Sequence, residues 1–164
     1  MERTELYLNT WRAYNEGSIG YGWMSAEEAE EFIKENPERD GGEWFIADID
    51  NYTGVKFSSL DYCDVMEVIQ SIKILEDLEE SERDEVVALM EYLNTDSAEK
   101  AVGEMDNYTF YADMDTFHDC MDELIDEELA SVPDSIARYF DYEEYHRDCD
   151  FDVTEMSNGV VIAA

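Results

Sequence analysis

Residues 64–75, DVMEVIQSIKIL, decide the fold of this protein. Apolar side chains recur there with the spacing of one helical face, at Val65, Val68, Ile69, Ile72 and Leu75. A second helix is expected after the acidic pair at 79–80, with apolar positions at Val86, Leu89, Met90 and Leu93. A short third helix is expected around residues 97–105. The sequence therefore predicts a central helical subdomain over residues 61–103.

On the N-terminal side, the pattern predicts a small antiparallel sheet with one helix over residues 1–60. Residues 5–11 (ELYLNTW) and 43–50 (EWFIADID) have the composition of strands, and the glycines after the first of them indicate a turn region. Ser25 followed by Glu28 forms a capping box, which predicts a helix that ends near Glu35, before Asn36-Pro37.

On the C-terminal side, residues 104–164 predict helices with a β-hairpin. Residues 107–112 resemble a strand, and residues 116–130 return to helical periodicity. Pro133 fits the first turn of a further helix. Residues 148–156 alternate, and Asn158-Gly159 is a hairpin turn signal. The expected fold class is therefore α+β, as an elongated chain of three small subdomains.

The composition is that of a folded protein. Of its 164 residues, 45% are hydrophobic and 13% aromatic, which is enough apolar surface to form a core. No run of about 18 apolar residues is present, so a transmembrane helix is excluded. Three widely spaced cysteines and the lack of a signal peptide favour the reducing cytoplasm.

The net charge is the exceptional property. Asp and Glu number 44 against 10 Lys and Arg, which gives −34. The three predicted subdomains carry −8, −10 and −16 in chain order. Such a surface repels nucleic acids and anionic membranes, so neither is an expected partner. We expect a basic protein partner.

The net charge can be compared with the length of duplex DNA that carries the same number of charges. Duplex DNA carries one charge per ~1.7 Å of axis, so 34 charges correspond to roughly 58 Å of duplex. A compact sphere of this chain length has a diameter of only about 40 Å. An elongated chain of subdomains would match the duplex better.

No catalytic, metal or cofactor motif is complete. Residues 148–152 (DCDFD) begin like a calcium loop, but Val153 and Gly159 stand where glycine and glutamate are required. His and Cys residues lack zinc-binding spacing, and there is no GxSxG, P-loop or GxGxxG motif. We therefore expect a protein that is not an enzyme and has no cofactor; weak calcium binding stays open as an alternative.

Several segments, in order along the chain, are similar to one family. They are residues 6–8 (LYL), 14–17 (YNEG), 22–23 (GW), 43–48 (EWFIAD), 132–133 (VP) and 139–148 (YFDYEEYHRD). The last one reads like a "YxDYxxYxRD" segment. Together they resemble the ArdA-type antirestriction proteins over nearly the whole chain.

The resemblance implies an inhibitor of type I restriction-modification enzymes that is carried on mobile DNA. It implies three small domains in a line and an elongated, curved homodimer that imitates bent B-DNA. By this resemblance, residues 111–119 correspond to the family's acidic antirestriction segment, and Phe110 and Tyr111 are expected near the dimer contact.

On this hypothesis carboxylates replace phosphates in a basic groove. Helical periodicity after Asp115 places several acids on an outer face. The residues expected to contact the partner are Asp113, Asp115, Asp119, Asp122, Glu123 and Asp126. An alternative is an acidic mimic directed at another DNA-binding protein, such as a nucleoid protein. A hydrolase with paired carboxylates is a further alternative, but 44 acids offer no means of choosing a pair.

Overall fold

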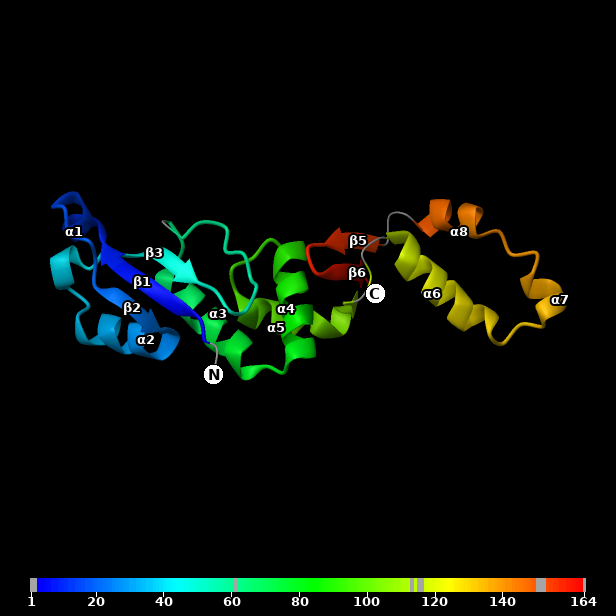
Figure 1. Ribbon diagram of the computed structural model, residues 1–164, viewed down its shortest axis with the longest axis horizontal. Helices are drawn as coiled ribbons and strands as arrows, with labels where there is room; N and C mark the ends of the chain where they lie inside the picture. Colours follow the sequence, from blue (N-terminus) through cyan, green and yellow to red (C-terminus); the bar gives the residue numbers. More distant parts are fainter. Residues whose placement is uncertain (1–2, 61, 113, 115–116, 150–152, 164) are drawn as a thin grey trace.

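The computed structural model describes residues 3–60, 62–112, 114, 117–149 and 153–163. In these residues it contains eight α-helices and two three-stranded antiparallel sheets, arranged along one long axis (Figure 1). The first sheet lies near one end, and α6, α7 and α8 lie at the other. The predicted α+β fold class is confirmed.

The first sheet has the strand order β2-β1-β3, with β1 (Glu5–Thr10) in the centre. The strands predicted over 5–11 and 43–50 are confirmed as β1 and β3 (Trp44–Asp50). Trp11 instead begins a short helix, α1 (Trp11–Asn15), because the Thr10 side chain accepts a hydrogen bond from the Ala13 amide. The edge strand β2 (Gly22–Ser25) was predicted as part of the glycine turn region. It is a strand because it pairs with β1.

Helix α2 (Ala26–Glu35) begins and ends as predicted. The Ser25 hydroxyl accepts from the Glu28 amide, and the Glu28 carboxylate accepts from the Ser25 amide at 2.9 Å. These bonds form the capping box. The bonds that the Glu28 carboxylate accepts from the Ser25 amide and hydroxyl hold its pKa below the usual value. Asn36 caps the other end, directly before Pro37, and a 3-10 turn, η1 (Arg39–Gly41), follows.

The three central helices are confirmed as α3 (Val65–Asp77), α4 (Glu80–Tyr92) and α5 (Ala98–Glu104). Most of the apolar face of α3 packs against the first sheet, in a core that includes Leu6, Leu8, Ile46, Val68, Ile69 and Ile72. Leu75, one turn further along α3, belongs to the next core, with side chains of α4 and α5. Helix α3 therefore connects the two largest cores.

The second sheet has the order β4-β6-β5, formed by β4 (Tyr108–Tyr111), β5 (Val153–Met156) and β6 (Gly159–Ala163). The predicted hairpin is confirmed, but its two-residue loop is Ser157-Asn158, and Gly159 pairs with Met156. The alternation predicted from residue 148 is wrong at its start, because Asp148 and Cys149 end a helix.

Beyond this sheet lie α6 (Phe117–Leu129), α7 (Asp134–Ala137) and α8 (Tyr142–Cys149). The helix predicted over 116–130 is thus confirmed. Pro133 is the N-cap of α7, one position before the predicted first turn. A small third core attaches this part to the sheet, with Val160 at its centre and Tyr111, Met114, Leu124, Tyr145 and Ile162 around it.

The subdomain boundaries at residues 60 and 103 stay predictions. The central core takes Val55 from before the first boundary and Val161 from after the second. Neighbouring parts of the chain therefore share apolar side chains.

We expect Gly159→Ala to destabilise the protein. A Cβ at this position would lie 2.4 Å from the Tyr111 carbonyl oxygen and 2.6 Å from the Phe110 ring. Forcing an atom into such a contact costs about 1–3 kcal/mol. Urea unfolding measures the change. The matched control is Gly103→Ala on α5, where nothing lies within 4 Å of the new Cβ; there we expect a gain of up to about 1 kcal/mol. Equal effects of the two substitutions would contradict the packing argument.

Glu30 joins α2 to α3 electrostatically. Its Oε2 accepts a hydrogen bond from Lys73 Nζ at 2.6 Å, and its Oε1 accepts one from Lys34. The bonds from Lys34 and Lys73 lower the pKa of Glu30 to about 2, and the bond to Glu30 raises the pKa of Lys73. Because the pKa of Glu30 is lower in the folded state, its stabilisation is present above the ordinary value near 4.5 and is lost as the pH falls toward 2.

Glu30→Gln should therefore lower the Tm at pH 7, and the difference from the parent protein should close between about pH 4.5 and 2. Thermal unfolding followed by circular dichroism over this range checks the effect. Glu31→Gln, an exposed neighbour on α2, removes the same charge and serves as the control. A Tm difference for Glu30→Gln that is constant with pH would contradict this role of the carboxylate.

Candidate acidic binding surface

The described acidic side chains all reach solvent: no Asp or Glu is among the buried residues of the described part. Basic residues are few, and their contacts are unevenly distributed along the described chain. Five ion pairs join described residues, and all five lie between Arg3 and Lys100. Two other bases stack on rings, Arg39 over Tyr21 at 4.9 Å and Arg83 over Tyr52 at 5.2 Å. Among the described residues, these ion pairs and ring contacts therefore lie in the first two-thirds of the chain.

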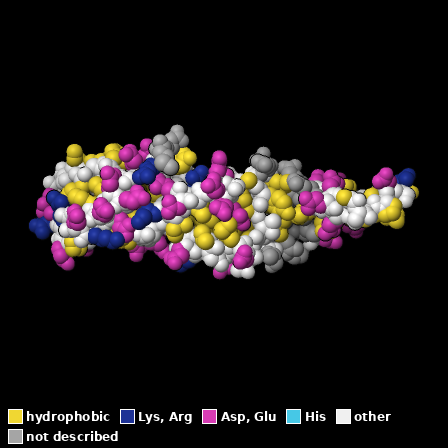
Figure 2. Space-filling view, turned by 90° about the horizontal axis from the view of Figure 1, so that it is seen from below, with side chains coloured by type: hydrophobic (Ala, Val, Ile, Leu, Met, Phe, Trp, Pro, Cys, Tyr) yellow, Lys and Arg dark blue, Asp and Glu magenta, His cyan; other side chains and the backbone are white. Residues whose placement is uncertain are grey.

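Figure 2 shows the same arrangement on one face of the molecule. Acidic side chains are spread along its whole length, whereas Lys and Arg gather mostly toward the end that holds α1 to α3. The opposite end, with α6 to α8, belongs to the segment with the largest net charge, −16 over residues 104–164.

Helix α6 turns outward those of its acids whose side chains the structure describes. Ile125 is buried and Leu124 packs against Val160, so this side of the helix faces the third core. Asp122 and Asp126, one turn apart, are both exposed. Glu127 and Glu128 continue the exposed acidic stretch. An amphipathic helix against a small core is the local reason why carboxylates line this surface.

One carboxylate of this surface is held in place by a tyrosine. The Tyr142 hydroxyl on α8 donates a hydrogen bond to Asp126 Oδ1 on α6 at 2.9 Å. This bond, followed by burial and the negative charges of Asp126 and Asp122, raises the pKa of Tyr142. Phe140 packs edge-on against the Tyr142 ring, with centroids 5.2 Å apart. The contact connects α6 and α8 and restricts where the carboxylate can move.

The structure describes the side chains of two of the six predicted contact residues. Asp122 and Asp126 are exposed, as expected. Asp113 and Asp115 lie outside the described residues. Asp119 and Glu123 belong to α6, but their side chains also lie outside the described part. A role in binding stays a prediction for all six.

The two residues predicted at a dimer contact are half-buried. Phe110 packs against the α4–α5 core, and Tyr111 packs against Val160 in the third core. Both therefore contribute to the fold of the single chain, and their dimer role stays a prediction.

The prediction from sequence missed part of the acidic surface. Helices α7 and α8 and their connection present further exposed carboxylates, at Asp134, Asp141, Glu143, Glu144 and Asp148. The tyrosine-rich segment at 139–148 was the available signal, because a tyrosine among acids can orient them by hydrogen bonding.

The described residues contain no group of three or more His, Cys, Asp or Glu side chains that could hold a metal ion. The segment 148–152, which begins like a calcium loop, is only partly described. In the same part of the chain, none of the helices has the length and apolar character needed to cross a membrane.

Comparison with known proteins agrees with the resemblance in the sequence. The family model described as "Antirestriction protein (ArdA)" matches residues 6–162. A comparison with curated proteins found no match. The family match includes both sheets, all three cores and the acidic helices α6 to α8. The chain therefore belongs to the ArdA family of antirestriction proteins.

Proposed function

We propose that this antirestriction protein occupies the DNA-binding groove of type I restriction-modification enzymes and so protects incoming mobile DNA. The observation that carries the proposal is the exposed, largely unneutralised acidic surface along an elongated molecule. Membership of the ArdA family supplies the class of target. No catalytic step is needed, because a bound inhibitor excludes DNA.

In this mechanism the carboxylates take the place of phosphates. Residues four apart on a helix are separated by about 6 Å along its axis, so Asp122 and Asp126 form a short row of charges on α6. Basic residues that line a DNA groove bind phosphates through Lys and Arg, and they can bind carboxylates through the same donors. The Tyr142 contact with Asp126 holds one member of the row before binding.

A folded acidic protein has two advantages over DNA as a ligand. Its charges are held by packing, so less entropy is lost on binding. It also does not need to be bent in the groove, whereas DNA bending costs energy. Attraction between the −34 protein and a basic groove should make association fast and dependent on salt.

The proposal includes a homodimer with Phe110 and Tyr111 near its contact, as the family resemblance implies. Pairing two chains would lengthen the acidic surface. Sedimentation of the protein at micromolar concentration tests the oligomeric state.

We expect the purified protein to inhibit DNA cleavage by a type I restriction-modification complex. Titration at several salt concentrations should show inhibition that weakens as ionic strength rises, because exposed charges are screened over about 8–10 Å at 0.10–0.15 M salt. Because the protein and DNA compete for one groove, non-specific duplex should relieve the inhibition only at a large excess over the protein. An absence of inhibition at micromolar protein would contradict the proposal.

Single charge reversals should have little effect and grouped ones a large effect. Exposed ionic contacts contribute about 0.2–1 kcal/mol each, so Glu127→Lys alone should weaken inhibition by less than about fivefold. Reversing Asp122, Glu127 and Glu128 together should weaken it by more than tenfold. The half-maximal inhibitory concentration in the cleavage assay measures both.

The matched control reverses Glu31, Glu35 and Glu38, three exposed acids at the other end of the chain. It changes net charge by the same amount. If the control loses as much inhibition as the α6 variant, net charge matters and the α6 surface does not. Strong loss from Glu127→Lys alone would contradict a distributed mimic.

A further inference from the structure

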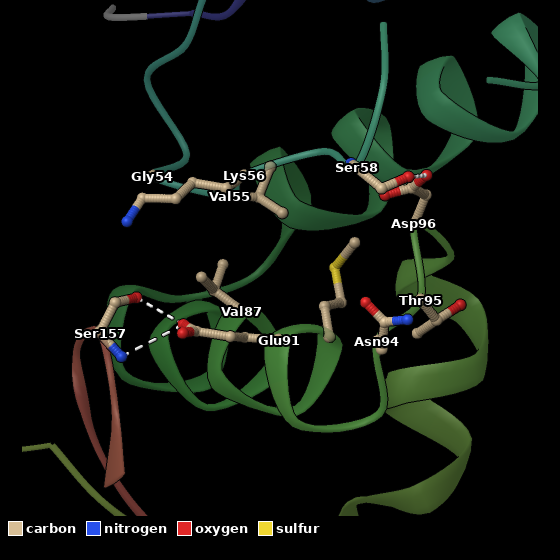
Figure 3. Close-up of a pocket in the computed structure, with 11 residues that line it drawn as sticks. Gly54, Val55, Lys56, Ser58, Val87, Glu91, Asn94, Thr95, Asp96 and Ser157 are labelled. Carbon is tan, nitrogen blue, oxygen red and sulfur yellow. Dashed lines mark hydrogen bonds between the residues drawn. The ribbon is translucent and has the colours of Figure 1, made fainter. Parts of the chain in front are cut away.

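A pocket of about 160 Å³ lies in the middle of the molecule, apart from the α6–α8 surface. Three segments far apart in the sequence form it: the loop at residues 54–58, the end of α4 with the turn through Asp96, and Ser157 of the β-hairpin loop (Figure 3). A space enclosed by three separate segments depends on the tertiary fold.

Part of the pocket lining is apolar, between polar residues such as Asn94 and Thr95. Val55, Val87 and Met90 line it and are only 4%, 7% and 2% exposed. These side chains belong to the central core, which holds them in place. These three side chains therefore offer a small apolar patch of fixed shape.

Two carboxylates lie at opposite ends of this pocket, Glu91 and Asp96 (Figure 3). A serine holds each one. Ser157 donates to Glu91 Oε2 through its amide at 3.2 Å and its hydroxyl at 2.6 Å. Ser58 donates to Asp96 through its amide at 2.8 Å and its hydroxyl at 2.5 Å. Both negative charges are therefore oriented before any partner arrives.

Lys56 also lines the pocket. Its side chain is exposed, and among the described residues its ammonium group forms no ion pair with Glu91 or Asp96. Lys56, the base in the pocket lining, is therefore not paired with either carboxylate.

We propose that this pocket receives an arginine or lysine side chain of the basic partner. The methylenes of such a side chain pack on the patch formed by Val55, Val87 and Met90, and its cationic head binds Glu91 or Asp96. The inference rests on the proposed function, because it needs a partner with basic side chains at its binding surface. A phosphate backbone offers no comparable apolar hollow. The pocket therefore supplies a contact that the duplex cannot, and favours the inhibitor over DNA.

The first test compares two double variants with equal charge. Glu91→Gln with Asp96→Asn changes the pocket. Glu80→Gln with Glu82→Gln removes two exposed acids at the other end of α4, which do not line it. Affinity for the type I complex is measured by competition with labelled duplex at fixed salt. We expect the pocket pair to lose at least about tenfold in affinity relative to the control, because hydrogen bonds to charged groups are the stronger ones.

A second variant keeps the net charge constant. Ser58→Ala with Ser157→Ala removes the hydroxyls that hold the carboxylates, and Ser81→Ala on the exposed side of α4 is its control. We expect a loss of affinity of several-fold from the serine pair and none from the control. Urea unfolding shows whether the variant with Glu91→Gln and Asp96→Asn folds. If it does not, the serine variant still tests the proposal.

The outcomes separate the two proposals. If the parent protein does not bind the type I complex, the proposed function fails and the pocket inference fails with it. If the parent binds tightly but both pocket variants bind as well as their controls, the pocket inference alone is overturned. The acidic surface would then act through its distributed charge only.

Discussion

The packing of one apolar helix face supports the rest of this structure. Val68, Ile69 and Ile72 of α3 are fully buried against the first sheet, and Leu75 is fully buried in the next core. At about 25 cal/mol per Å² of apolar surface, burying a side chain of this kind stabilises the fold by roughly 1.5–3 kcal/mol. Because one helix serves two cores, the sheet at one end and the helices at the centre are held together.

This packing has to oppose a net charge of −34. With ten bases for 44 acids, most carboxylates cannot form an ion pair, and exposed ion pairs contribute little in any case. An elongated arrangement keeps like charges further apart than a sphere would. Several small cores along one axis therefore allow a stable fold although few of the surface carboxylates are neutralised.

The acidic surface combines a general field with fixed local features. Exposed acids on α6 and α8 supply the field, and field effects spread over many residues. The Tyr142 contact with Asp126 and the serine-held carboxylates of the central pocket are different, because specific hydrogen bonds hold individual charges in place. Long-range attraction and short-range recognition can then be carried by different parts of one molecule.

The sequence by itself determined the properties that depend on neighbours along the chain. The helical spacing of α3, the Ser25–Glu28 capping box and the total charge could all be predicted, since each depends on residues a few positions apart. The exposure of Asp122 and Asp126 followed from the periodicity of α6.

Only the tertiary structure decided features that join distant residues. Strand β2 exists because it pairs with β1, although its own four residues carry no strand pattern. Gly159 is required by the Tyr111 carbonyl, which lies 48 positions earlier. Ser157 holds Glu91 across 66 positions. Such contacts depend on how the elements pack, and no local pattern of residue types encodes which carboxylate will meet a serine far away in the sequence.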